Sequence, residues 1–180
     1  MIKTNPYNVS QIKKVADELR KSYNVPSDTF FPIYDYIMAL CDADYLEYQI
    51  LDDDNKFFAE GEYAKYCGVD NTIYVKDSVD AEVTEQSVIG YRSNFTLAHE
   101  LFHFLQVQVL KFNFENVDEK PQAFCDPEWQ ANEFAGQLLV PEKYLNLEEE
   151  EIMNRFHVSQ ECALYRKLKY KTRNKGKNNG

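Results

Sequence analysis

Residues 95–110 read FTLAHELFHFLQVQVL, a stretch that is apolar on nearly every face and typical of a helix buried inside a domain. Its polar side chains gather on one stripe of the helical wheel: Thr96, His99, Glu100, His103 and Gln106. A polar stripe on a buried helix must face partners, a cavity or a metal ion, because a polar group without a partner is costly to bury. We therefore expect the fold to be built around this helix.

Within the stripe, His99, Glu100 and His103 have the spacing HExxH. Two histidines four residues apart in a helix lie one turn apart on the same face, where one ion can bind both ring nitrogens. A glutamate beside them can take a proton from water that the metal activates. In a chain of this length and composition, the number of HExxH patterns expected by chance is only about 0.005. The spacing predicts a metal site with Glu100 as its base.

A catalytic zinc site needs a third protein ligand and an open fourth position. The candidates downstream are Glu115, Asp118, Glu119, Cys125, Asp126, Glu128, Glu133 and His157. On a wheel of the helix expected at residues 128–140, Glu128 falls on or beside the apolar face, whereas Glu133 falls on a side that we expect to be solvated. A carboxylate turned toward the core needs a partner, so we predict that Glu128 is the ligand.

Two further interpretations concern the same helix. Asn132 lies one turn after Glu128 and is placed to support a ligand histidine from behind. The alternative for Glu128 is an exposed glutamate in the first turn, where the helix dipole favours a negative charge.

The rest of the chain predicts an α+β domain with a short three-stranded sheet packed on helices, because three strands precede a run of helices. Ser10 is the expected cap of the first helix. The expected helices cover residues 9–23, 31–41, 95–110, 128–140, 148–156 and 159–170, the strands 45–51, 56–59 and 72–75, and the loops 76–90 and 111–127. We expect one domain over residues 1–170, which comprises N-terminal helices (9–45), a small sheet and loop (45–90), the zinc-site helices (94–140) and C-terminal helices (141–170), followed by a disordered basic tail (171–180).

Composition narrows the class of protein. The chain has 180 residues, of which 44% are hydrophobic and 14% aromatic, enough for a substantial core. Its net charge is −10, and the first 165 residues hold 13 basic and 30 acidic residues, so sequence-independent binding of nucleic acid by the whole surface is not expected. Four scattered cysteines form no CxxC pair, and neither a transmembrane run nor a signal peptide is indicated. We expect a cytoplasmic protein.

Three blocks of sequence occur in a characteristic order: RSNFTLAHELFHF (92–104), EWQANEFAGQLLVP (128–141) and RFHVSQECALYRKL (155–168). Together they resemble the ImmA/IrrE family of metallopeptidases. The resemblance implies a zincin-like fold, zinc on His99, His103 and Glu128, and Glu100 as the catalytic base. Many members have glycine before the second histidine, where this chain has Phe102. That side chain points away from the polar stripe, so we expect altered packing and intact chemistry.

The resemblance also implies a role: a regulatory zinc endopeptidase that cleaves a helix-turn-helix repressor, as an anti-repressor in a mobile element or stress response. Candidate stabilisers of the oxyanion are Tyr91, Arg92 and His157. Two histidines and one carboxylate also suit manganese or iron.

Two rival functions remain open at this stage. The first is a metal-containing binding module that sequesters a repressor, or acts in a toxin–antitoxin pair, without cutting; the intact base Glu100 argues against it. The second is direct transcriptional regulation through the helix of residues 158–168 and the basic tail, and the overall acidity argues against that.

Overall fold

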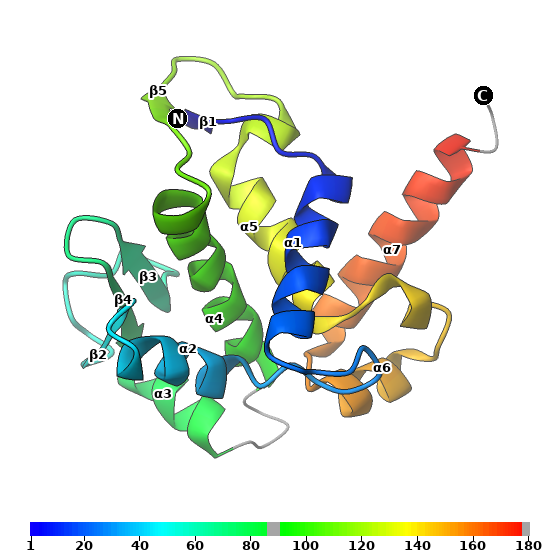
Figure 1. Cartoon of the computed structure of the whole chain (residues 1–180), viewed down its shortest axis with the longest axis horizontal. Helices are drawn as coiled ribbons and strands as arrows, with labels where there is room; N and C mark the ends of the chain where they lie inside the picture. The colour runs from blue at the N-terminus through cyan, green and yellow to red at the C-terminus, as the bar shows by residue number, and fades with distance from the viewer. Residues whose placement is uncertain (86–90, 178–180) are drawn as a thin grey trace.

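The computed structural model describes the backbone of residues 1–85 and 91–177, and the side chains among them up to residue 172. This part of the chain forms an α+β structure of seven α-helices and two small sheets (Figure 1). The helices are α1 (Val9–Ser22), α2 (Ile33–Asp42), α3 (Asp77–Thr84), α4 (Tyr91–Phe104), α5 (Pro127–Leu139), α6 (Glu149–Phe156) and α7 (Gln160–Lys177). The strands are β1 (Ile2–Thr4), β2 (Glu47–Leu51), β3 (Ala64–Cys67), β4 (Thr72–Lys76) and β5 (Phe114–Asn116). The predicted α+β class is therefore confirmed.

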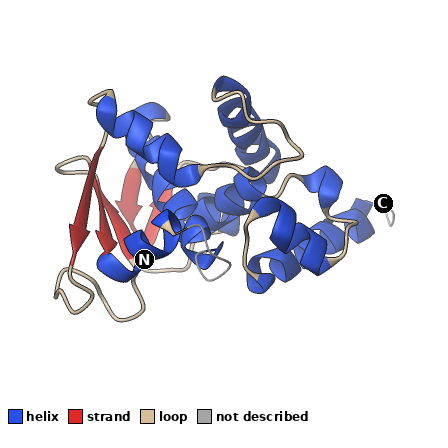
Figure 2. Cartoon of the chain, turned by 90° about the horizontal axis from the view of Figure 1, so that it is seen from below, coloured by secondary structure: helices blue, strands red, loops and turns tan. Residues whose placement is uncertain are grey.

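Helix α4 lies at the centre of the molecule. It contacts β3, α2 and α3 on one side and α5 on the other, and Figure 2 shows the strands toward one side with helices filling the rest. Leu97, Ala98, Leu101 and Phe102 of α4 are fully buried. After Phe104 the helix widens into a π-helical turn at Leu105–Val109, closed by a hydrogen bond from Leu110 N–H to Leu105 C=O. The expected helix at residues 95–110 is thus an α-helix with a π-helical end.

The first helix, α1, packs on α5, and its apolar side chains Ile12, Ala16 and Leu19 are buried. Its cap is Asn8, not Ser10 as we expected. The Asn8 Oδ1 atom accepts hydrogen bonds from Ser10 N–H (2.9 Å) and Gln11 N–H (3.1 Å), and Gln11 Oε1 accepts from Asn8 N–H. Because the helix begins at Val9, Ser10 lies inside the first turn, two residues after the cap position.

The three-stranded sheet has the order β2-β4-β3, with β2 parallel and β3 antiparallel to β4. Two predicted strands are confirmed as β2 and β4. The strand expected at residues 56–59 is wrong, because this stretch forms turns held by side-chain acceptors. Asn55 accepts from Phe57 N–H and Glu62 accepts from Ala59 N–H, and such local bonds compete with strand pairing. The third strand is β3 instead.

A second correction concerns residues 76–90, which we expected to be a loop. Residues 77–84 form α3, with Asp77 and Asp80 in the first turn, where the helix dipole favours negative charge. Val79 and Val83 lie on one face of α3 and are buried. Residues 86–90 lie outside the described part of the chain.

The loop expected at residues 111–127 contains β5, which pairs antiparallel with β1. The register joins Ile2 to Asn116 and Thr4 to Phe114. This β1–β5 ribbon ties the N-terminus to the segment that links α4 to α5. A 3₁₀ turn at Ala123–Cys125 follows, and a second one, Glu142–Tyr144, comes after α5.

The C-terminal tail is also corrected, because α7 continues through Lys177 where disorder was expected from residue 171. Lysine and arginine are good helix formers, no proline interrupts the segment, and Thr172 Oγ1 bonds back to Leu168 C=O at 2.9 Å. Residues 178–180 are not described. Across the described residues, no helix is both long and apolar enough to cross a membrane.

Candidate metal centre

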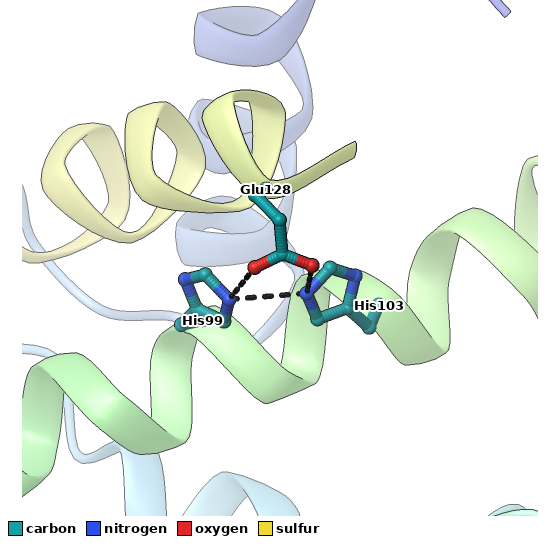
Figure 3. Close-up of side chains that lie close together, drawn as sticks. All are labelled: His99, His103 and Glu128. Atoms are coloured by element: carbon teal, nitrogen blue, oxygen red, sulfur yellow. Dashed lines mark hydrogen bonds and ion pairs between the residues drawn. The ribbon is translucent and has the colours of Figure 1, made fainter. Parts of the chain in front are cut away.

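Figure 3 shows three side chains converging between α4 and the start of α5: His99, His103 and Glu128. The two ring Nε2 atoms lie 3.0 Å apart. Glu128 Oε2 lies 3.2 Å from His99 Nε2, and Glu128 Oε1 lies 3.4 Å from His103 Nε2. One ligand atom from each residue lies within 4.8 Å of the others. The structure therefore brings together the three side chains that were predicted to share a metal.

The local sequence explains this convergence. His99 and His103 lie one turn apart on α4, as their spacing predicts. Helix α5 begins with Asp126 as its cap and Pro127 in its first turn, and Asp126 accepts from Glu128 N–H at 3.0 Å. Glu128 is thereby held in the first turn of α5, directly above the two rings.

Each histidine is oriented by an amide on its far side. His99 Nδ1 lies 3.2 Å from Asn132 Oδ1, which is the supporting contact that the sequence predicts. His103 Nδ1 lies 2.9 Å from Gln106 Oε1, a contact that the sequence interpretation missed. Gln106 belongs to the predicted polar stripe, but its role depends on a residue of another helix.

That residue is Gln130 of α5, which is fully buried together with Gln106. Gln130 Nε2 donates to the carbonyl oxygens of Asn5 (2.9 Å) and Phe124 (2.8 Å), so its Oε1 atom must face Gln106. Gln106 Nε2 donates to Gln130 Oε1 at 2.8 Å, which turns Gln106 Oε1 toward His103. This amide relay requires a hydrogen on His103 Nδ1 and leaves Nε2 directed at the site.

A metal ion fits this arrangement. Two imidazole Nε2 atoms and a carboxylate converge on one point, and both rings have their other nitrogen engaged by an amide oxygen. Ligands of a tetrahedral zinc, at bond lengths of about 2.0–2.1 Å, lie about 3.3–3.4 Å from one another. The separations of 3.0, 3.2 and 3.4 Å are close to that value. The donor set is one that zinc, manganese and iron accept.

The electrostatics of the three side chains are those of an ion pair between the imidazoles and the Glu128 carboxylate. Burial lowers the pKa of His103, but its hydrogen bond to Glu128 and the nearby charge of Glu100 outweigh burial, and the net effect is a raised pKa. Hydrogen bonds from His103 and His99 hold the pKa of Glu128 well below its usual range. The point where the two rings and the carboxylate meet therefore favours positive charge.

Glu100 is buried on α4 beside the two histidines. Its Oε2 atom accepts a hydrogen bond from Tyr66 N–H of β3 at 2.7 Å, which fixes the carboxylate against the sheet. Burial raises the pKa of Glu100, although His99, His103 and the Tyr66 hydrogen bond act in the opposite direction. A carboxylate that is less willing to stay ionised is a stronger base, which suits it to accept a proton.

The three side chains open into a cleft of about 750 Å³. Residues of β3 and its approach form one wall, α4 and Glu128 form the floor and the other wall, and Ile2 and Phe114 of the β1–β5 ribbon lie at the margin. Because Tyr63 C=O accepts from Lys76 N–H of β4, the backbone groups of Ala64 and Tyr66 point away from β4. The outer edge of β3 therefore faces the cleft.

The proposed oxyanion stabilisers separate into two groups. Arg92 lines the cleft, and its guanidinium lies over the ring of Tyr63, 4.3 Å from the centroid. Tyr91 and His157 line a different cavity of about 160 Å³, where the His157 ring stacks between Phe30 (4.2 Å) and Tyr91 (4.9 Å). The structure brings Arg92 toward the candidate metal centre and does not bring Tyr91 or His157 there.

The environments of the two carboxylates of α5 differ from the sequence expectation. The Glu133 side chain, expected on a solvated side, is 1% exposed and lies 3.5 Å from the equally buried guanidinium of Arg166. That side of α5 is covered by α7, which the wheel of one helix cannot show. Glu128, expected on or beside the apolar face, is 66% exposed, because the first turn of α5 projects beyond the core.

Phe102 packs as the wheel predicted. It is fully buried, and its ring stacks on Phe134 of α5 with 4.6 Å between centroids. It therefore occupies the α4–α5 interface and leaves the polar stripe of α4 unobstructed.

Comparisons with known proteins agree with this arrangement. Residues 90–167 match the family model described as Peptidase M78, IrrE N-terminal-like domain. Among solved structures, the chain is similar to a Mycobacterium tuberculosis transcriptional regulator, with a TM-score of 0.55 and 14% sequence identity over 89% of this chain and 47% of that one. At this identity the likeness shows a shared fold, and the chain spans about half the length of that protein. No curated protein sequence gives a significant match.

The matched segment holds α4, α5, α6 and most of α7, and therefore every residue of the candidate metal centre. It also holds the first two sequence blocks on which the predicted resemblance rested, and all of the third except its last residue. The predicted resemblance to the ImmA/IrrE family is confirmed over residues 90–167, the segment that matches the Peptidase M78 family model.

Proposed function

We propose that this chain is a zinc-dependent metalloendopeptidase with a zincin-like site, in which His99, His103 and Glu128 hold the metal and Glu100 is the catalytic base. The observation that carries the proposal is the convergence of three ligand atoms within 4.8 Å beside a buried glutamate, with both imidazoles oriented by amides. A purely structural role for the two histidines does not account for Glu100, whose buried carboxylate is aimed at the same cleft.

When bound, zinc supplies Lewis acidity, which polarises a scissile carbonyl and makes water easier to deprotonate. Glu100 takes a proton from the attacking water and later delivers it to the leaving amine. Tyr66 N–H holds Oε2 of Glu100 in place, so the base keeps its orientation through both transfers. Asn132 and the amide relay keep the two rings from rotating.

Two features of the cleft support a peptide substrate. The outward backbone groups of β3 offer hydrogen-bonding partners to an extended chain, as sheet edges commonly do. Arg92 at the cleft wall carries the positive charge that an oxyanion requires, and we retain it as the proposed stabiliser in preference to Tyr91 and His157.

The proposed substrate is a helix-turn-helix repressor, and the role is that of an anti-repressor in a mobile element or stress response. The match of residues 90–167 to the Peptidase M78 family model supports a regulatory metallopeptidase, and the similar solved structure is that of a transcriptional regulator. The acidic body of the chain, with a net charge of −17 over the first 165 residues, complements a basic DNA-binding partner.

The test uses the zinc-loaded chain and a candidate repressor encoded beside it. Glu100→Gln is expected to keep zinc and lose cleavage, because only the proton carrier is removed. Glu62→Gln is the matched control, since Glu62 lines the same cleft but contacts Ala59 and Lys65. Retained cleavage in Glu100→Gln overturns the proposed mechanism. Relief of repression by Glu100→Gln without cleavage favours the sequestering binding module instead.

A further inference from the structure

A second cavity of about 350 Å³ opens beside the cleft, between α4, α5 and the start of α7. It is lined by Arg92, Phe95, Thr96, Asn132, Ser159, Glu161, Cys162 and Tyr165. The first four of these residues also line the metal cleft, so the two cavities are adjacent. We call this second cavity the side pocket.

The position of the side pocket relative to the metal centre is fixed by Asn132. Its Oδ1 atom contacts His99 Nδ1, and the same residue lines the side pocket. The entrance therefore lies one side chain away from a proposed zinc ligand. A peptide whose carbonyl reaches the metal centre has an adjacent side chain within reach of this entrance.

The chemistry of the side pocket is that of an apolar receptor. Phe95 and Tyr165 supply aromatic walls, and Tyr165 is 37% exposed. Cys162 is buried, and burial raises the pKa of its thiol to about 12, so the thiol stays neutral. The Ser159 hydroxyl is engaged by Cys162 N–H at 3.3 Å.

The charged residues of the side pocket do not favour a charged ligand. Arg92 and Glu161 are both exposed and carry opposite charges. A charged side chain of a substrate would lose its hydration in the side pocket without finding a net opposite charge there. Transfer of an aromatic side chain from water into the side pocket would be favourable. The volume also suits a large side chain, since it falls in the range of small-molecule sites.

We infer that the side pocket is the specificity subsite of the enzyme and takes a large apolar side chain, aromatic in preference, from the residue that flanks the scissile bond. The inference rests on the proposed function, since it assigns a substrate class to the same site. It predicts that cleavage sites carry phenylalanine, tyrosine or a similarly large apolar residue at one position.

The test compares two hydroxamates on the zinc-loaded protein by calorimetric titration. Acetohydroxamate carries only the zinc-binding group, and 3-phenylpropanohydroxamate adds an aromatic side chain. We expect the aromatic compound to bind roughly tenfold or more tightly, because the ring leaves water for the side pocket. Tyr165→Ala is expected to reduce that ratio at least threefold while acetohydroxamate binds as before.

Tyr45→Ala is the control, because Tyr45 is an exposed tyrosine (66%) that lines neither the side pocket nor the metal cleft. Equal affinity for the two hydroxamates in the wild type overturns the side-pocket inference and leaves the metal centre standing. An unchanged ratio in Tyr165→Ala also overturns it. Failure of both compounds to bind, or of zinc to load, contradicts the proposed function itself and the inference with it.

Discussion

Two glutamates of α5, five residues apart, have opposite surroundings. Glu128 is 66% exposed and faces two imidazole rings across 3.2 and 3.4 Å. Glu133 is 1% exposed and lies within a network that joins α5 to α7, where Arg166 and Gln137 both contact its Oε1 atom. Judged by exposure alone, Glu128 would be an ordinary surface residue and Glu133 would be the residue of the functional site.

The difference between them lies in the charges nearby. Glu133 has the guanidinium of Arg166 as a built-in counter-charge, and Arg166 in turn donates to Gln137 Oε1 and Val140 C=O, each at 3.0 Å. Glu128 faces ring nitrogens whose hydrogens are held on the opposite side by Asn132 and Gln106. One carboxylate is neutralised by the fold, and the other is arranged to receive a cation. The predictions below test this division of roles.

The largest effect on stability is expected at Glu133. Replacing it with alanine removes the carboxylate beside a buried guanidinium, which lowers the free energy of unfolding by about 3–5 kcal/mol. Urea unfolding of the metal-free protein measures this loss. The double variant Glu133→Leu/Arg166→Met removes both charges and is expected to recover much of it. A loss below about 1 kcal/mol for Glu133→Ala would contradict the structural role.

Glu128→Ala is expected to weaken zinc binding at least about 100-fold, because a ligand is lost. Competition with a chromophoric chelator measures the affinity. Glu115→Ala is the control, since Glu115 was a rival third ligand and lies in the exposed strand β5. Equal zinc affinity in Glu128→Ala and the wild type would remove Glu128 from the site.

A smaller effect on zinc affinity is expected at Gln106. Gln106→Leu leaves His103 Nδ1 without its acceptor, which is expected to weaken zinc binding about 10- to 100-fold. Gln108→Leu is the control on the same π-helical turn, because Gln108 contacts Tyr66 OH instead. Full affinity in Gln106→Leu would show that the relay does not act on the ring.

The smallest effect is expected at Gly136 of α5, which packs against the side chain of Arg166 from α7. A Cβ atom at this position would lie 2.5 Å from Arg166 Cδ, so the Arg166 side chain must move. Overpacking costs about 1–3 kcal/mol, and the better helix propensity of alanine returns up to about 1 kcal/mol, so Gly136→Ala is expected to destabilise the protein by about 1 kcal/mol. Thermal unfolding measures it, and a more stable variant would show that Arg166 is not tightly held.

The sequence was most informative where the signal is local. The HExxH spacing places two rings on one face of α4, and the structure shows them with Nε2 atoms 3.0 Å apart. The contact of Asn132 with His99 was also predicted, because Asn132 lies one helical turn after Glu128. Helix periodicity and ligand spacing are properties of a few neighbouring residues, so one sequence is enough to read them.

The sequence was misleading where distant segments meet. The helical wheel of α5 predicted Glu128 as the ligand because it placed Glu128 near the buried face. In the structure Glu128 is exposed and Glu133 is buried. Glu133 is buried because it contacts Arg166 of α7, which lies 33 residues later in the chain. The amide relay depends on Gln130 meeting the backbone of Asn5, 125 residues away. The β1–β5 ribbon depends on a similar long-range pairing. Contacts between segments so far apart in the chain produce no hydrophobic periodicity in either segment, so the sequence pattern does not predict them.

Zinc K-edge X-ray absorption of the zinc-loaded wild-type chain tests the central claim most directly. The proposed site predicts nitrogen and oxygen ligands at about 2.0–2.1 Å, with the outer-shell scattering of two imidazole rings. Fewer than two imidazoles, or a sulfur ligand at about 2.3 Å from one of the four cysteines, would contradict a centre built from His99, His103 and Glu128.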